Sequence, residues 1–332
     1  MRPLLLCGAV VVLATGCPPP KGGTSGGGGR GGTSINPGAC GDLSTDPVTR
    51  KLHSFLAASA ELDRSTAELE GSVHEACVRM ATELGVATDG DTRTVCKRAG
   101  DELQANLQVS VSQEQRLVTR YVPPICSSQI DFTAGIVAEC EAAVAAEVSV
   151  RCEGSCSGTC SGACEGACAT TGDDGACNGA CDGRCNGSCS GTCNGYATVD
   201  ASAECRASAQ IQASVHTACS EPRVEVVTQN VTIVDDRKFQ YALAAINAGM
   251  PTLLRAGAKA QLVGQALGDW VKTGGSLLRS SGQLVSALGE RGVCVAGQLA
   301  ATVAAAAQIE ARISVSIEVT ASVSASAGAQ PQ

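Results

Sequence analysis

The chain has 332 residues, of which 7 are aromatic, 20 are cysteine and 39 are glycine. Its 24 basic and 32 acidic residues give a net charge of −8, and the basic residues are scattered along the sequence. Nucleic-acid binding needs a basic surface that neutralises phosphates, and single strands also need aromatic side chains on which bases stack. The composition therefore excludes a nucleic-acid-binding protein. The length leaves room for two domains of ordinary size.

The N-terminal residues 1–16 have the pattern of a signal peptide. A short basic start precedes an apolar stretch at residues 4–13, which is too short for the ~20 residues of a membrane-spanning helix. The sequence Leu-Ala-Thr-Gly-Cys follows at residues 13–17. This segment resembles the lipobox of bacterial lipoproteins, although that family usually has leucine where this chain has Ala14. The resemblance implies that Cys17 is acylated and becomes the first residue of the mature protein.

The resemblance also implies a destination. Pro18 follows Cys17, where an aspartate would, in that family, direct retention in the inner membrane; an outer-membrane location is therefore expected. Residues 17–39 are rich in Gly, Pro and Ser and have no apolar periodicity, so they cannot bury enough surface to fold. We expect a flexible tether between a lipid anchor and a folded body. The alternative is an ordinary secretory signal that is cleaved nearby.

The cysteines predict a disulfide framework. Eighteen remain when Cys7 leaves with the signal peptide and Cys17 is acylated, and an even number in an exported chain favours disulfides. Ten of them form two runs, in residues 152–168 and 177–193, with the repeat Cys-x-Gly-x. If the chain folds back after Gly172, the two runs oppose each other and the numbers of facing residues add to 345.

The same sum relates two cysteine pairs outside the runs, so one register accounts for seven cross-strand disulfides. The pairs are Cys126–Cys219, Cys140–Cys205, Cys152–Cys193, Cys156–Cys189, Cys160–Cys185, Cys164–Cys181 and Cys168–Cys177.

The flanks of the runs alternate between apolar and polar side chains. Even-numbered positions are apolar over residues 132–152, and odd-numbered positions are apolar over residues 197–219 apart from Thr217. A period of two is typical of strands, and an odd sum brings the two apolar faces together. We therefore expect one stapled ribbon over residues 126–219, shortened by twist and bends. Glycines face glycines in the same register, and a type II′ turn lies at residues 171–174.

Residues 40–125 predict a helical hairpin followed by a strand. Asp46 and Pro47 are a typical N-cap and first helical residue, and apolar side chains continue at helical spacing to Leu84. A second helix is expected around residues 93–107.

Residues 220–332 predict a strand, helices and a final strand. Helices are expected from Asp235 onward, with Pro251 starting a new one. Residues 313–325 alternate strictly and predict the final strand. Weaker strand candidates are residues 109–111 and 224–234.

Four cysteines lie outside the register. Their helical positions suggest Cys77 with Cys96, which leaves Cys40 with Cys294. The predicted fold class is α+β. A long antiparallel β-hairpin ribbon stapled by cross-strand disulfides packs at its base, with extra strands, against long amphipathic helices.

No motif indicates catalysis or a cofactor, and neither a catalytic residue nor a metal ligand is expected. Structural zinc sites favour Cys-x-x-Cys, which the chain lacks, so disulfides are favoured over a metal-thiolate cluster. His53, His74 and His216 have no paired ligands nearby in the sequence, and Asp173 and Asp174 form a solvated turn.

The sequence thus predicts a non-enzymatic, lipid-anchored protein of the bacterial cell envelope. Its expected partners are the membrane, through the anchor at Cys17, and a protein at the envelope or cell surface. The alternatives are an extracytoplasmic protein that binds soft metals through free thiolates and, third, an exported enzyme.

Overall fold

The computed structural model describes residues 35–111, 117–228 and 231–331, which belong to one compact unit. The expected signal peptide, Cys7, Cys17 and most of the tether lie outside the described residues. The helices are α1 (Pro47–Leu84), α2 (Thr92–Val109), α3 (Ile130–Glu141), α4 (Ala203–Val215), α5 (Asp236–Arg279), α6 (Ser281–Leu288) and α7 (Glu290–Ser326), with short 3-10 helices η1 (Pro37–Cys40) and η2 (Ala145–Glu147).

The strands form two sheets. A five-stranded antiparallel sheet has the order β4-β3-β5-β2-β6, and a three-stranded sheet has the order β7-β1-β8. The strands are β1 (Val118–Val122), β2 (Cys126–Gln129), β3 (Val150–Cys168), β4 (Cys177–Ser190), β5 (Thr192–Val199), β6 (Ala218–Cys219), β7 (Arg223–Val227) and β8 (Ala329–Pro331). The predicted α+β class, with a disulfide-stapled hairpin, is confirmed.

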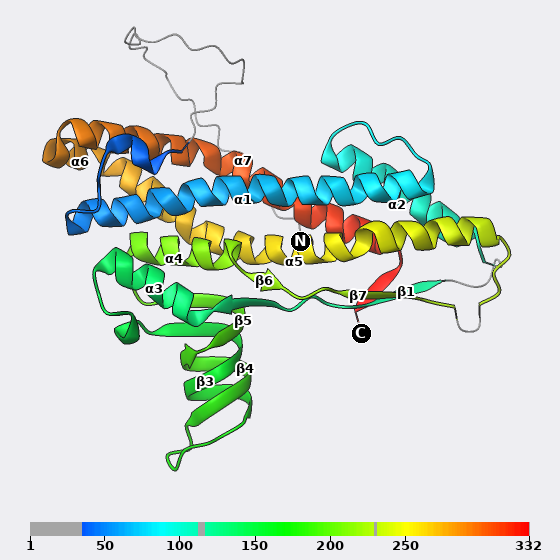
Figure 1. Ribbon diagram of the computed structural model, residues 1–332, viewed down its shortest axis with the longest axis horizontal. Helices are drawn as coiled ribbons and strands as arrows, with labels where there is room; N and C mark the ends of the chain where they lie inside the picture. Colours follow the sequence, from blue (N-terminus) through cyan, green and yellow to red (C-terminus); the bar gives the residue numbers. More distant parts are fainter. Residues whose placement is uncertain (1–34, 112–116, 229–230, 332) are drawn as a thin grey trace, which may run out of the picture. The chain divides into compact units, whose positions relative to one another are not determined.

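Three long helices, α1, α5 and α7, pack together and carry most of the apolar core, with α2 and α4 against them (Figure 1). Trp270 of α5 is fully buried and stacks on Phe55 of α1, with 6.5 Å between ring centroids. Its indole nitrogen donates a hydrogen bond of 2.8 Å to the Ser59 hydroxyl, so the polar atom of this large side chain is satisfied inside the core.

Helix α1 begins and ends where the sequence predicts. The Asp46 carboxylate accepts hydrogen bonds from the backbone amides of Val48 and Thr49, which have no partner within the helix, and Pro47 occupies the first turn. Gly85 ends the helix in the left-handed conformation, with φ of 70°.

Two expectations for the C-terminal region are wrong. Pro251 lies inside α5 and does not start a new helix. Residues 313–325 are helical and belong to α7, and the last strand is β8. The buried side chains of this stretch recur every three or four residues and lie on one helix face: Ile313, Ser316, Val319, Thr320 and Val323. The partly buried Val315 and Ile317 made the alternation resemble a strand.

Residues 118–227 form an arm that doubles back on itself; its β7 and α4 contact the long helices, and its outer part, β3 and β4, projects from them (Figure 1). At its start β1 pairs with β7, Val118 opposite Val227, and the pair β2–β6 places Cys126 opposite Cys219. Both pairs of residue numbers add to 345. The weak strand prediction for residues 224–234 is met only in part, by β7. The strand expected after the helical hairpin is β1 at Val118–Val122; residues 109–111 hold only the end of α2 and an isolated bridge from Val111 to Ile233.

The middle of the arm is helical, so the prediction of strands over residues 132–152 and 197–219 is wrong for most of each segment. Helices α3 and α4 pack side by side, and Cys140–Cys205 joins them. Nine of the 13 residues of α4 are buried, because the helix lies between α3, α1 and α5. Most of the buried residues are alanine and serine, and alanine is the strongest helix former, so the composition favours the helix despite the alternating pattern.

A coiled ribbon filled with disulfides

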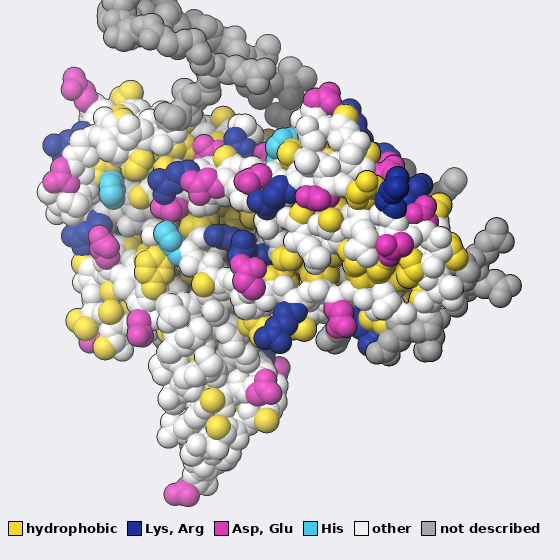
Figure 2. Space-filling view, turned by 45° about the vertical axis from the view of Figure 1, so that its right-hand side comes forward, with side chains coloured by type: hydrophobic (Ala, Val, Ile, Leu, Met, Phe, Trp, Pro, Cys, Tyr) yellow, Lys and Arg dark blue, Asp and Glu magenta, His cyan; other side chains and the backbone are white. Residues whose placement is uncertain are grey.

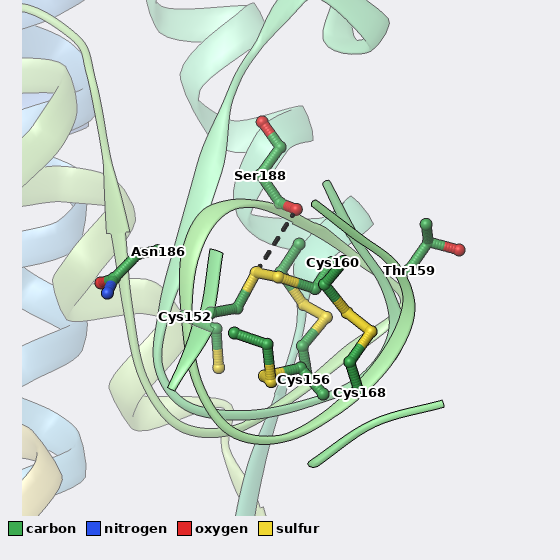
Figure 3. The surroundings of a disulfide bond; sticks show 12 residues. Cys152, Cys156, Thr159, Cys160, Cys168, Asn186 and Ser188 are labelled. Atoms are coloured by element: carbon green, nitrogen blue, oxygen red, sulfur yellow. Dashed lines mark hydrogen bonds between the residues drawn. A yellow bond between two sulfur atoms is a disulfide. The ribbon is translucent and has the colours of Figure 1, made fainter. Parts of the chain in front are cut away.

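The outer part of the arm is the coiled ribbon, defined as residues 150–193: β3, β4, the turn between them and the first residues of β5. Strand β3 pairs with β4 along both of its edges: Cys160 lies opposite Cys189 on one side and Gly179 on the other. Two strands can be neighbours on both edges only if the ribbon winds about an axis and successive turns hydrogen-bond to each other. Figure 3 shows the backbone curving around the disulfides.

The cysteines fill the interior of this coil. Of the ten cysteines in the two runs, eight are buried. The two that are partly exposed, Cys164 and Cys168, lie near the tip. The five predicted ribbon disulfides are confirmed: Cys152–Cys193, Cys156–Cys189, Cys160–Cys185, Cys164–Cys181 and Cys168–Cys177. Sulfur here takes the place of the apolar side chains that a small domain would bury.

The ribbon disulfides do not join directly opposed residues, which corrects the predicted register. Cys164 lies opposite Cys185, with numbers that add to 349, but is bonded to Cys181. The Cα atoms of the five bonded pairs are 5.6–6.0 Å apart, within the ordinary range for disulfides. The bonds are diagonal because the ribbon is coiled, and each cysteine reaches across the axis to a neighbouring rung.

Glycines face glycines as predicted, but each glycine of β3 faces the glycine four residues after its predicted partner. Gly162 lies opposite Gly187 and Gly166 opposite Gly183. A β-carbon at either member of these pairs would overlap the backbone of the facing strand. Glycine is therefore needed at these positions because two backbones approach closely there.

The tip is a different turn from the one predicted. The Gly175 amide donates to the Gly172 carbonyl at 3.0 Å, and Gly175 has φ of 80°. The reversal therefore centres on Asp173 and Asp174, both exposed, with the left-handed glycine at the end of the turn. A type II′ turn would need a positive φ at Gly172, and Gly172 does not have one.

The outer surface of the coil is polar and carries few charges (Figure 2). Between the cysteines and glycines, β3 and β4 present mostly Ser, Thr, Asn and Ala to solvent. Arg184 forms an ion pair with Glu153, and Thr159 and Asn186 point away from the disulfides (Figure 3). The coil therefore presents a mostly polar surface to solvent and keeps most of its cysteines inside.

The remaining four disulfides of the described residues also match the pairs that the sequence predicts. Cys126–Cys219 closes the root of the arm, Cys140–Cys205 joins α3 to α4, Cys77–Cys96 joins α1 to α2, and Cys40–Cys294 ties η1 to α7. Nine disulfides in one chain indicate an extracytoplasmic location, because reducing compartments do not maintain them.

The histidines and carboxylates do not assemble into a site. His216 lies edge-on to Phe132, and its Nε2 is 3.5 Å from a carboxylate oxygen of Glu61. Within the described ranges no three His, Cys, Asp or Glu residues are grouped to hold a metal ion. Helix α7 is long and apolar enough to cross a membrane, which by itself is weak evidence, since core helices meet the same criteria.

A cavity borders the long helices at the start of the arm, and no sequence motif indicates it. This cavity of about 380 Å³ lies between α1, α5 and the residues around β6, and Arg255 and Lys259 line it. These residues are more than 180 positions from Ser65 and Ser72 on the opposite wall, so no local sequence pattern could indicate that they lie together.

Comparisons of the chain with protein-family models, with curated proteins and with solved structures find no match.

Proposed function

We propose that the protein is a non-enzymatic, lipid-anchored component of the bacterial cell envelope that presents the coiled ribbon as a rigid contact element. One observation carries this proposal: the ribbon is cross-linked by disulfides within itself, and β4 makes almost all of its contacts with β3. Its outer surface is polar and faces solvent. A segment that contributes so little to the main core, yet is cross-linked five times, is built to keep a shape outside it. The proposed partner is a protein at the envelope or cell surface.

The structural independence of the ribbon can be tested by shortening it. Deleting residues 160–185 and joining Thr159 to Asn186 removes the three outer disulfides and keeps Cys152–Cys193 and Cys156–Cys189. Thr159 lies opposite Ser190, so residues 186–189 can serve as the new turn. The helical body should unfold at an unchanged temperature, because the removed residues bury little of its apolar core. A variant that cannot fold would show that the ribbon is part of the core.

The contact role is tested by photo-crosslinking in the native envelope. A photoreactive amino acid replaces Ser161, which is exposed on the coil, and in a matched control it replaces Arg64, which is exposed on α1. We expect a discrete protein adduct from position 161 and none of comparable yield from position 64. The proposal would be contradicted if adducts formed only from position 64 on the helical body. It would also be contradicted if the shortened chain, which lacks the outer ribbon, still bound the same envelope partner in full.

The anchor is tested at the predicted acylation site. Replacing Cys17 by serine should move the protein from the membrane fraction to the soluble extracytoplasmic fraction, since a serine side chain offers no thiol for the diacylglycerol group. Mass spectrometry of the mature N-terminus of the unaltered protein should show a lipid on Cys17. A soluble wild-type protein whose mature N-terminus carries no lipid would refute the anchor.

The soft-metal alternative would require free thiolates. All eighteen cysteines in the described part of the chain are in disulfides. Thiol titration of the denatured mature protein therefore discriminates the two functions: near-zero free thiol supports the contact element, and many free thiols with bound metal would support the alternative.

A further inference from the structure

The cavity at the root of the arm has the character of a binding site. It lies on the face of α5 between Thr252 and Lys259, opposite Ser65 and Ser72 of α1. Cys219, which is disulfide-bonded to Cys126, lines one side. Its volume of about 380 Å³ falls within the range typical of small-molecule pockets. Four hydroxyl groups and two cations line it, against the single carboxylate of Glu68.

The two cations differ in how they are neutralised. Arg255 forms an ion pair with Glu221, a residue just outside the cavity. Lys259, one helical turn further along α5, is partly buried, and no carboxylate of the described residues lies within 4 Å of its amine. Burial lowers the pKa of Lys259; the Glu68 carboxylate opposes this effect and Arg255 reinforces it. A partly desolvated cation without an ion-pair partner favours an incoming negative charge.

The apolar part of the lining fits the rest of a small ligand. Leu69 of α1 and Ala256 of α5 are buried side chains on the wall of the cavity, and they lie beside the polar groups. A ligand with one anionic group and a short apolar body could therefore pair with Lys259 and cover these side chains at the same time.

We propose that this cavity binds a small organic anion, whose carboxylate or phosphate group pairs with the Lys259 amine and accepts hydrogen bonds from the hydroxyls of Ser65 and Thr252; the hydroxyls of Ser72 and Thr217 already donate to backbone carbonyls. The proposal goes beyond the contact role of the ribbon and does not depend on it. Because the cavity adjoins Cys126–Cys219 at the root of the arm, a bound anion would also join α1, α5 and the arm.

The test uses a phosphate-bearing aldehyde as the probe. The mature, oxidised protein is incubated with pyridoxal 5′-phosphate and treated with borohydride: the lysine amine and the aldehyde form an imine with loss of water, and hydride reduces the imine to a stable amine. Peptide mass spectrometry then gives the extent of labelling at each lysine. We expect Lys259 to be labelled several-fold faster than Lys272, which lies on the same helix and is 81% exposed.

Two controls separate anion binding from mere reactivity of the amine. Pyridoxal, which lacks the phosphate, should lose the preference for Lys259, and added inorganic phosphate or acetate should protect Lys259 but not Lys272. Protection by only one of the two anions would identify the preferred group. Equal labelling of the two lysines, equal rates with and without the phosphate group on the probe, or no protection by either anion would each overturn the proposal.

Matched variants give a second readout. In Lys259→Met the phosphate-protected labelling should disappear, while Lys272→Met should leave it unchanged. Thermal unfolding shows whether each variant is folded. Phosphate should raise the unfolding temperature of the wild type and of Lys272→Met but not that of Lys259→Met. A folded Lys259→Met that phosphate stabilises as strongly as the wild type would contradict the assignment.

Discussion

Replacing Gly158 by alanine is expected to prevent the coiled ribbon from forming its native disulfides. A β-carbon at this position would overlap the carbonyl oxygen of Ser190 on the facing strand. An extra methyl group in a packed core typically costs about 1–3 kcal/mol, and here the obstacle is backbone, which cannot rotate away as a side chain does. The strands would have to separate, and Cys156 and Cys160 on either side of Gly158 would lose their geometry.

The measurement is oxidative refolding followed by peptide mapping without reduction. The native pairs Cys156–Cys189 and Cys160–Cys185 should fall to a minority of the products in Gly158→Ala. The matched control is Gly71→Ala in α1, where a β-carbon would meet nothing within 4 Å. That substitution should keep every native pair and stabilise the helix by roughly 0.5–1 kcal/mol. A native map for Gly158→Ala would show that the two backbones are not in close contact.

Removing the disulfide Cys40–Cys294 should destabilise the helical body more than removing any ribbon disulfide. The bond spans 254 residues, whereas Cys168–Cys177 at the ribbon tip spans 9. In the loop-entropy description a cross-link stabilises by restricting the unfolded chain, which gives about 5 kcal/mol for the long loop and about 3 kcal/mol for the short one. The two losses of stability should also affect different parts of the protein. Removing Cys168–Cys177 should destabilise only the ribbon, because the loop that it closes lies wholly within the ribbon.

The comparison uses two double variants, Cys40→Ala/Cys294→Ala and Cys168→Ala/Cys177→Ala. Thermal unfolding is followed by the helical circular dichroism signal, which comes from α1, α5 and α7 far more than from the ribbon. The first variant should unfold at a markedly lower temperature, and the second should be close to wild type. If the tip variant lost as much helical stability as the first, the ribbon and the body would be one cooperative unit.

The cysteine positions determined the topology of the arm. The sum of 345 derived from the two cysteine runs also holds for Cys126–Cys219 and for the β1–β7 ladder, where no cysteine was used to set it. The sum does not hold for the backbone of the coiled ribbon, where Cys164 lies opposite Cys185 with numbers that add to 349. The disulfide pairs could therefore be found from the sequence, although the backbone register of the ribbon and several helices were assigned wrongly.

Helix limits with strong local signals were also readable from the sequence. Asp46 and Pro47 fix the start of α1 through side-chain and backbone chemistry that acts within four residues. Pro251 misled because α5 tolerates it: a helix held on several sides by α1, α4 and α7 can lose one backbone hydrogen bond and continue.

Only the tertiary structure decided whether the alanine-rich and valine-rich segments became strands or helices. In residues 132–141, 203–215 and 313–325 the intrinsic preferences conflict, because alanine favours helices whereas valine, isoleucine and threonine favour strands. The packing of α3 on α4, of α4 on α1 and α5, and of α7 on α1 and α5 selected the helix. The coil was likewise hidden from the sequence, because a flat ribbon and a wound one can place the same cysteines in bonding distance. Winding prevails because it satisfies both edges of β3 and takes the sulfur atoms out of water, which a flat ribbon would leave exposed.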